Sequence, residues 1–261
     1  MSRIPPPSAR RPRRLAVPLL LAAISLAAAP GLPASPAAAQ ALTPEQRREV
    51  VQVMREALRQ DPSILRDAFA ALEEAARQQA SEGRAGAIRA EAGALFRDPA
   101  DPVKGNPRGD VTLVEFFDAR CGYCKALHPT LEALLRADPG VRIVMKDLPI
   151  LGPASVLASR ALLAAQRQDR YVELQAALMK LRGEPTEATL QAEAKKLGLD
   201  WARLRRDMED PAIERRLQEH LRLARALSIE GTPALVIGET LVPGAVDLPT
   251  LQRLVAEARK G

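Results

Sequence analysis

The stretch at residues 111–124 reads Val-Thr-Leu-Val-Glu-Phe-Phe-Asp-Ala-Arg-Cys-Gly-Tyr-Cys. Its first half has the β-branched and aromatic composition of a strand. The helical pattern that follows starts at Cys121 and runs to about Asp138, and a second strand is expected at 141–145. Strand, helix and strand in this order predict a βαβ unit with a parallel sheet. Cys121 and Cys124 are the two cysteines of the chain, and they lie at the junction between the first predicted strand and the predicted helix.

The rest of the chain extends this unit toward the C-terminus. Residues 153–228 return to a helical pattern broken by proline and glycine, and three or four helices fit there. Two further strands are expected at 234–237 and 240–242, and Asp247 is suited to start a last helix. The sequence therefore predicts an α/β fold in the order βαβ, helical block, ββα.

A helical region is expected before this domain, over residues 43–97. It opens with a capping box and a proline at 43–46. A heptad-spaced apolar stripe follows at Leu65, Phe69, Leu72 and Ala76. The stripe has two interpretations: an arm that associates with copies of itself, or a helix face that packs on its own domain. Residues 98–109 are expected to be a loop or a domain boundary.

Residues 1–39 have the features of an export signal. They hold five arginines and no acidic residue, followed by an apolar run at 15–29 and a small-residue stretch that ends at Ala39. The alternative is an N-terminal membrane anchor, but the run is shorter than the roughly 18–20 residues that a spanning helix needs. Export would place the thiols where disulfides form and persist.

The composition excludes several classes of protein. Of the 261 residues 47% are hydrophobic, which is enough for a buried core. Two cysteines and two histidines exclude a disulfide-rich scaffold, a four-cysteine zinc site and a three-histidine metal site. Without residues 1–39 the formal charge falls from +6 to +1, because 33 basic residues then face 32 acidic ones. No nucleic-acid partner is expected from so small an excess.

The cysteine spacing points to redox chemistry. Two intervening residues in a first helical turn let the sulfurs form a small ring, and the free amides and dipole of a helix N-terminus stabilise a thiolate. A thiolate attacks disulfides, so Cys121 is the expected nucleophile and Cys124 the resolving thiol. Two alternatives are a structural disulfide, whose short loop would add little stability, and a metal site that includes His128. We expect no metal and no cofactor.

A family resemblance rests on two motifs. Residues 116–125, Phe-Phe-Asp-Ala-Arg-Cys-Gly-Tyr-Cys-Lys, resemble the active-site stretch of DsbA-family thiol-disulfide oxidoreductases, and are most similar to the suppressor-of-copper-sensitivity C (ScsC) proteins among them. Residues 231–238, Gly-Thr-Pro-Ala-Leu-Val-Ile-Gly, resemble the family's cis-proline loop, which faces the cysteines. The continuation at 240–244 also resembles the disulfide isomerase DsbC, and residues 147–152 together with the helical block fit the DsbA-like insertion.

The resemblance implies a thioredoxin-like fold with a helical insertion, preceded by an N-terminal helical arm. The expected organisation is a signal peptide at 1–39, an oligomerisation arm at 40–97 and a DsbA-like domain at 98–261, with the insertion at 153–228.

The resemblance also assigns roles in the site. Pro233, preceded by Thr232, would be the cis proline, and the Thr232 backbone would pair with a substrate peptide as an added strand. Glu115 matches the family's buried acid, which would exchange a proton with Cys124. Strand alternation alone leaves open whether Glu115 faces inward or outward. Between the cysteines, Gly122 and Tyr123 would tune the thiolate and shape substrate docking.

The function implied is a periplasmic enzyme that forms or isomerises disulfides in exported proteins, with isomerisation favoured. Its partners would be cysteine-containing exported proteins, a membrane redox partner and further copies of the chain bound through residues 43–97. The Gly-Tyr dipeptide differs from the Pro-His of DsbA, so the oxidising power of DsbA does not carry over. The alternatives are a copper-binding or chaperone-like protein that uses the thiolates as ligands, and a monomeric DsbA-like oxidase.

Overall fold

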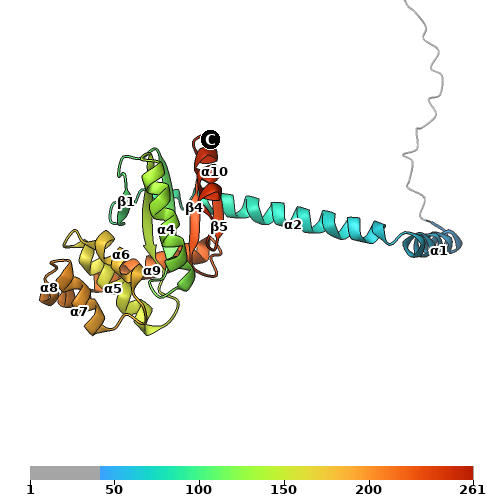
Figure 1. Cartoon of the computed structure of the whole chain (residues 1–261). Coiled ribbons are helices and arrows are strands. Elements are labelled where there is room, and N and C mark those ends of the chain that lie inside the picture. Colours follow the sequence, from blue (N-terminus) through green and yellow to red (C-terminus); the bar gives the residue numbers. More distant parts are fainter. Residues whose placement is uncertain (1–41, 261) are drawn as a thin grey trace, which may run out of the picture. The chain divides into compact units, whose positions relative to one another are not determined.

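The structure, a computed structural model, describes residues 42–260 (Figure 1). The expected signal peptide at 1–39 lies outside the described residues. The described chain divides into two units, one that ends at residue 62 and one that starts at residue 63. In the part of the chain that the structure describes, no helix combines the length and apolar character needed to cross a membrane.

The described part of the first unit is built around helix α1 (Pro44–Gln60). The predicted capping box is present: Thr43 Oγ1 accepts from the Gln46 amide at 3.2 Å, and Gln46 Oε1 accepts from the Thr43 amide at 3.0 Å. Helix α1 has no buried residue. Its valines and Met54 are exposed, so the apolar side chains of α1 have no covering layer within the described chain.

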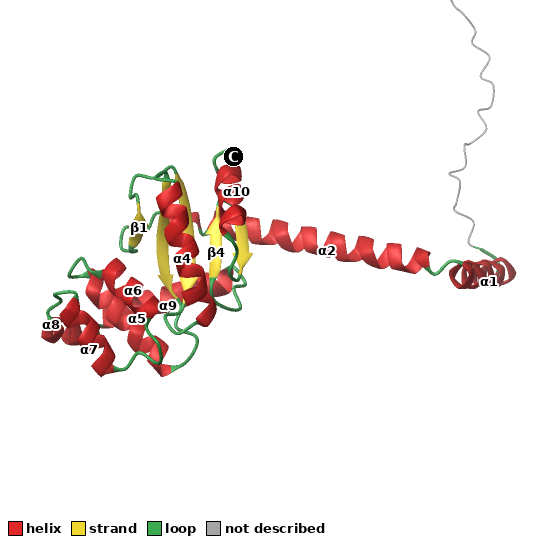
Figure 2. Ribbon diagram, in the orientation of Figure 1, coloured by secondary structure: helices red, strands yellow, loops and turns green. Residues whose placement is uncertain are grey.

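The second unit holds all the other elements (Figures 1 and 2). In chain order they are α2 (Ser63–Ala90), α3 (Ala92–Phe96), β1 (Val103–Gly105), β2 (Val111–Phe117), α4 (Gly122–Ala137), β3 (Val141–Asp147), α5 (Pro153–Gln166), α6 (Tyr171–Lys180), α7 (Glu187–Lys196), α8 (Trp201–Asp207), α9 (Pro211–Ala226), β4 (Ala234–Ile237), β5 (Thr240–Pro243) and α10 (Leu248–Ala258).

The sheet has the order β1-β3-β2-β4-β5. Strands β2 and β3 are parallel, which confirms the predicted βαβ unit, and the other three neighbouring pairs are antiparallel. The helical block contains five helices, α5 to α9, where three or four were expected. Strand β1 lies inside the predicted loop at 98–109. Three residues are too few to show a strand pattern, and β1 is held by pairing with β3 about forty residues later.

Helices cover both faces of the sheet (Figure 2). Leu113 and Phe117 of β2 share one core cluster with α4, α10 and the helices α5 to α8. Val114 and Phe116 point the other way and pack with residues of α2, α3 and α9. The near-continuous apolar run of β2 follows from this, because a strand buried on both faces has no solvent side to alternate with.

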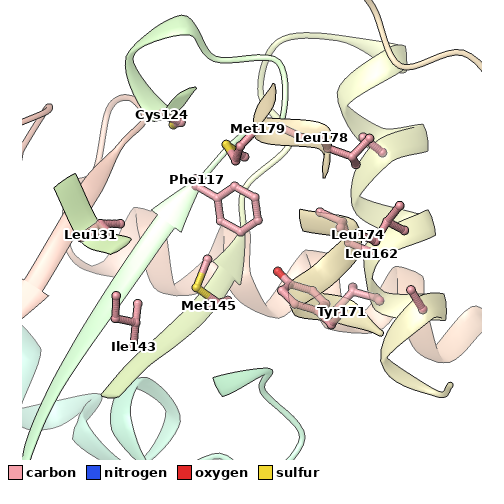
Figure 3. Packing of buried hydrophobic residues seen from close by; sticks show 14 of the residues in the cluster. Phe117, Cys124, Leu131, Ile143, Met145, Leu162, Tyr171, Leu174, Leu178 and Met179 are labelled. Carbon is pink, nitrogen blue, oxygen red and sulfur yellow. The ribbon is translucent and has the colours of Figure 1, made fainter. Parts of the chain in front are cut away.

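The larger cluster joins the sheet to the helical block. Figure 3 shows Phe117 and Met145 of the sheet together with Leu174 and Tyr171 of α6, and Cys124 at the end of the same cluster. The thiol of Cys124 is therefore part of a continuous apolar core.

Helix α2 changes character along its length. The stripe residues Leu65, Phe69 and Leu72 are 45%, 64% and 66% exposed, whereas Ile88 near the C-terminal end is 1% exposed and belongs to the second core cluster. Within its own unit, the heptad stripe is therefore not covered by the sheet domain. Only the last turns of α2 are built into that domain.

A buried charge cluster joins the predicted boundary segment to the domain. The Lys146 ammonium pairs with the carboxylate of Asp101 and donates to the Ala94 carbonyl at 2.7 Å. His220 Nε2 lies 3.2 Å from Asp101 Oδ1, and Arg216 of the same helix, α9, pairs with Asp98. Residues 98–101 are thus an integral part of the second unit.

Candidate functional site

The cysteine pair lies at the carboxyl end of β2, where α4 begins. Cys121 is the N-cap residue of α4, and its amide donates to the Asp118 carbonyl at 3.0 Å. Both thiols are free, Cys121 is 7% exposed and Cys124 is fully buried. The outer sulfur thus lies beside the free amides of a helix start, and the inner one lies in the apolar core.

The cis-proline loop lies directly against the outer sulfur. The Thr232–Pro233 peptide bond is cis, as the resemblance predicted. Cys121 Sγ donates to the Thr232 carbonyl at 3.2 Å, which joins two segments 111 residues apart in the chain. The loop is held in turn by the Gly244 amide, which donates to the Pro233 carbonyl at 2.8 Å. The structure therefore brings together the two predicted motifs around one thiol.

A buried acid lies on the adjoining strand face. Glu115 is 2% exposed, so it faces inward, which settles the orientation that strand alternation left open. Burial raises the pKa of Glu115 to about 7; the charge of Lys104 opposes the rise and the carboxylate of Asp147 adds to it.

The inner thiol is coupled to this acid. Burial raises the pKa of Cys124 well above the ordinary thiol range, and the neighbouring Cys121 and Glu115 add to the rise. At neutral pH Cys124 is therefore a protonated thiol beside an acid whose pKa lies close to the ambient pH.

The family follows from a comparison with known sequences. A profile of the DsbA-like thioredoxin domain matches residues 112–256, more than half of the 261 residues. The chain belongs to the DsbA-like thioredoxin domain family. The resemblance to DsbA-family oxidoreductases, drawn from the cysteine and cis-proline motifs, is confirmed.

Solved structures agree with this assignment. A thioredoxin-like oxidoreductase from Silicibacter pomeroyi is 44% identical and has a TM-score of 0.63, over 65% of this chain and 98% of that one. A linker-deletion mutant of Proteus mirabilis ScsC is 32% identical, also with a TM-score of 0.63, over 85% of this chain and 98% of that one. The ScsC-like character expected from the sequence is therefore supported.

Among relatives of assigned function, one has a lower sequence identity than these structures and another is a much longer protein. The thiol:disulfide interchange protein DsbA of Bordetella pertussis is 24% identical over 172 residues, which cover 61% of this chain and 82% of that protein. The chain is 30% identical over 169 residues, 62% of its length, to the Na(+)/H(+) antiporter NhaA 1 of Salinispora arenicola. It spans about a quarter, 26%, of the length of that antiporter.

Asp118 organises the loop beside the cysteines, a role that sequence analysis missed. Its side chain is completely buried and accepts three amides: Arg120 at 2.8 Å, Ile150 at 3.0 Å and Leu151 at 3.1 Å. The local half of this arrangement is an Asx turn, whose Asp-x-N–H pattern is visible in the sequence. The other half depends on the tertiary fold, because residues 150 and 151 follow a different strand.

The side chains that flank the site are partly exposed. Tyr123 is 73% exposed, and Ile150 and Leu151 are 42% and 46% exposed. The Arg120 guanidinium donates to the Leu151 carbonyl and pairs with Glu184 of the helical block. Apolar surface for contact with another chain is thus present on residues that the fold holds next to Cys121.

Lys104 of β1 is a second residue that sequence analysis missed. It is 6% exposed, pairs with Glu132 of α4, and its Nζ lies 3.5 Å from both His128 Nδ1 and Gln175 Oε1. No local signal marks it, because its strand is recognisable only from pairing. Burial, and then the charge of Lys104, lower the pKa of His128 to about 4, so this ring is neutral.

His128 therefore takes part in a buried contact with Lys104 and Glu132. Within residues 42–260, no group of three or more histidine, cysteine or acidic side chains is arranged to hold a metal ion.

Gly122 is exposed beside Tyr123 at the start of α4, and Lys125 donates to the Leu181 carbonyl at 2.8 Å.

Proposed function

We propose that the chain is a thiol-disulfide oxidoreductase that isomerises or forms disulfides in exported proteins, with Cys121 as its nucleophile. The observation that carries the proposal is the position of Cys121 Sγ at a helix start, 3.2 Å from the carbonyl that precedes the cis proline. Thiolates are stabilised at such positions, and the Thr232 backbone beside the cis proline would pair with an extended substrate segment as an added strand.

The first step is attack on a substrate disulfide. The Cys121 thiolate attacks one substrate sulfur, the substrate S–S bond breaks, and the second substrate sulfur leaves as a thiolate. The product is a mixed disulfide between Cys121 and the substrate. Isomerisation is complete when a different substrate thiolate attacks that bond and releases Cys121 without net oxidation or reduction.

The competing second step uses Cys124. Its thiol gives up a proton, attacks Cys121 Sγ and releases the substrate as a dithiol, while a Cys121–Cys124 disulfide forms. We assign the proton acceptor to Glu115, because its pKa of about 7 lets it accept a proton at neutral pH. Formation of a substrate disulfide is the reverse of this sequence, after a membrane redox partner has oxidised the cysteine pair.

The exposed stripes favour isomerisation over pure oxidation. Residues on α2 at 65, 69 and 72 present a large apolar surface without cover in their own unit, which is typical of an interface between chains. Several active sites in one oligomer raise the concentration of thiolate around a misfolded substrate. The proposal therefore includes self-association through residues 43–97. It also includes export through the signal at 1–39 and action in the periplasm.

Two variants test the cysteine roles. Cys124→Ser is expected to accumulate a mixed disulfide with a scrambled test protein, and Cys121→Ser is expected to form none and to lose turnover. Recovery of native activity from the scrambled protein, compared with oxidation of the same protein in its reduced form, separates an isomerase from an oxidase. Retention of turnover by Cys121→Ser would rule out the assignment.

A further inference from the structure

A groove opens beside the cis-proline loop, between that loop and helix α2. Its volume is about 490 Å³, and its walls include Glu230, Thr232 and Pro233 of the loop, Leu241 of β5 and Arg84 of α2. Figure 1 shows the C-terminal part of α2 running next to β5. A segment of the predicted arm thus forms one wall of a cavity within the catalytic domain.

The groove and the thiol site have one residue in common, Thr232. Thr232, which lines it, also accepts the hydrogen bond from Cys121 Sγ at 3.2 Å. A polypeptide joined to Cys121 through a disulfide therefore has its reacting sulfur next to Thr232, a residue of the groove wall. The occupant that fits is therefore an extended segment of the substrate on one side of its cysteine.

The position of Arg84 is fixed by the core. Arg84 precedes the buried Ile88 by four residues, so the two side chains share one face of α2. One turn further on, Arg89 pairs with Glu239 at the turn between β4 and β5. These contacts hold α2 against the sheet edge and aim Arg84 at the groove.

The charges of the groove are available for a ligand. Arg84 and Glu230 are both exposed, and within residues 42–260 neither has an ion-pair partner. This differs from Arg89, whose charge is matched by Glu239. A guanidinium in a groove beside apolar walls suits a carboxylate, to which it donates two parallel hydrogen bonds.

We infer that Arg84 is a specificity-determining residue that binds an acidic side chain close to the reacting cysteine of the substrate. This inference rests on the proposed function, since it concerns the segment that is joined to Cys121. It also gives the end of the helical arm a role in substrate choice that is separate from self-association.

A set of short peptides tests the inference. Each peptide carries one cysteine disulfide-bonded to a coloured aromatic thiol, and one residue within three positions of the cysteine is Glu, Gln or Lys. Attack by Cys121 on the peptide sulfur releases the aromatic thiolate, whose absorbance gives the rate. We expect at least one position where Glu reacts about two- to five-fold faster than Lys, the effect of one exposed ion pair. The preference should shrink in high salt.

Variants of the full mature chain decide the source of that preference. Arg84→Glu should reverse the Glu-to-Lys ratio and Arg84→Lys should keep its direction. The matched control is Arg108→Glu, which makes the same charge change in the loop before β2, at the opposite end of that strand from Cys121. It should retain the wild-type ratio. Equal rates for Glu and Lys in the wild type, or an unchanged ratio in Arg84→Glu, would overturn the inference.

The test separates this inference from the proposed function. If the wild-type protein releases thiol from all peptides but Arg84 has no influence on the ratios, only the role of Arg84 is lost. If the wild type releases no thiol from any peptide, the nucleophilic role of Cys121 fails, and the inference falls with it.

Discussion

The two cysteines have opposite environments although only two residues separate them. Cys121 keeps 7% exposure at the start of α4, whereas Cys124 is fully buried and its pKa is raised by burial. The thiolate is the reactive form, so burial disfavours reaction at Cys124 through both access and ionisation.

Brief alkylation of the reduced protein with iodoacetamide at pH 7 should therefore modify Cys121 and leave Cys124 unmodified. Mass spectrometry of the digested protein measures the label at each site. Cys121→Ser should stay unlabelled while folded and take up one label after denaturation. Rapid labelling of Cys124 in the folded wild type would contradict this expectation.

Burial of Glu115 lowers the free energy of unfolding by an amount that depends on pH. Its folded pKa is about 7 against an ordinary value of 4.5. Between these values the folded state keeps a proton that the unfolded state has lost, so the free energy of unfolding falls as the pH rises through this window. Above pH 7 the cost is complete, at about 3 kcal/mol for a shift of this size.

Glu115→Gln should therefore stabilise the protein at pH 8 by up to about 3 kcal/mol and have little effect near pH 5. Urea unfolding at the two pH values measures the difference. Asp147, whose pKa burial also raises to about 7, keeps part of the pH dependence in the variant. The same change at exposed Glu82 is the control, and equal pH dependence in wild type and Glu115→Gln would show that Glu115 is not the source.

At the scale of single elements, the loop after β3 depends on one distant carboxylate. Asp118 accepts the amides of Ile150 and Leu151, and this loop carries part of the exposed apolar surface near the thiol. Removal of a buried acceptor leaves its donors unsatisfied, at about 1–3 kcal/mol each.

Asp118→Ala is accordingly expected to lower the free energy of unfolding by about 2–4 kcal/mol and to speed proteolysis within residues 148–152. Chemical denaturation and limited proteolysis followed by mass spectrometry give the two readouts. Asp110→Ala, which removes an exposed carboxylate paired with Arg259, should change both far less. Equal effects of the two variants would mean that Asp118 does not hold the loop.

The C-terminal end of α2 packs in the domain core, whereas its N-terminal part is exposed. Substitution of an apolar residue by alanine should therefore cost more stability at the C-terminal end. Ile88→Ala removes a buried side chain and should cost about 2–4 kcal/mol of folding free energy. Leu65→Ala, at a side chain 45% exposed, should cost much less. Thermal denaturation at low protein concentration measures both; similar losses would contradict the assignment of Ile88 to the core and of Leu65 to the surface.

At the scale of the whole molecule, the exposed stripe predicts the oligomeric state. Phe69 and Leu72 are 64% and 66% exposed, and their burial between chains would remove a large apolar area from water. The mature protein is therefore expected to sediment as an oligomer, and Phe69→Asp with Leu72→Asp as a monomer.

Isomerase activity should fall in the monomeric variant while alkylation of Cys121 continues at the wild-type rate. A deletion made for the same purpose must end before about residue 80, because Ile88 belongs to the domain core. A wild-type protein that sediments as a monomer, or a monomeric variant with full isomerase activity, would exclude the proposed role of the arm.

Local sequence signals were sufficient to predict the secondary-structure elements and the reacting groups. Strand β2, the helix start at Cys121, the caps at Thr43 and Asp247 and the parallel βαβ unit all follow from signals within a few residues, and the structure contains each of them. The Cys-x-x-Cys and Gly-Thr-Pro motifs likewise predicted the family from the sequence, because each motif is contiguous in the chain.

The surroundings of these groups depend on long-range packing, which local signals do not report. The inward orientation of Glu115, the burial of Lys104, the three amides on Asp118 and the position of Arg84 at the groove all depend on contacts between segments far apart in sequence. Periodicity reports which face of an element is apolar, but not which partner covers that face. The pKa of Glu115 and the shape of the substrate groove are therefore properties of the packed sheet and helices, and no local pattern carries them.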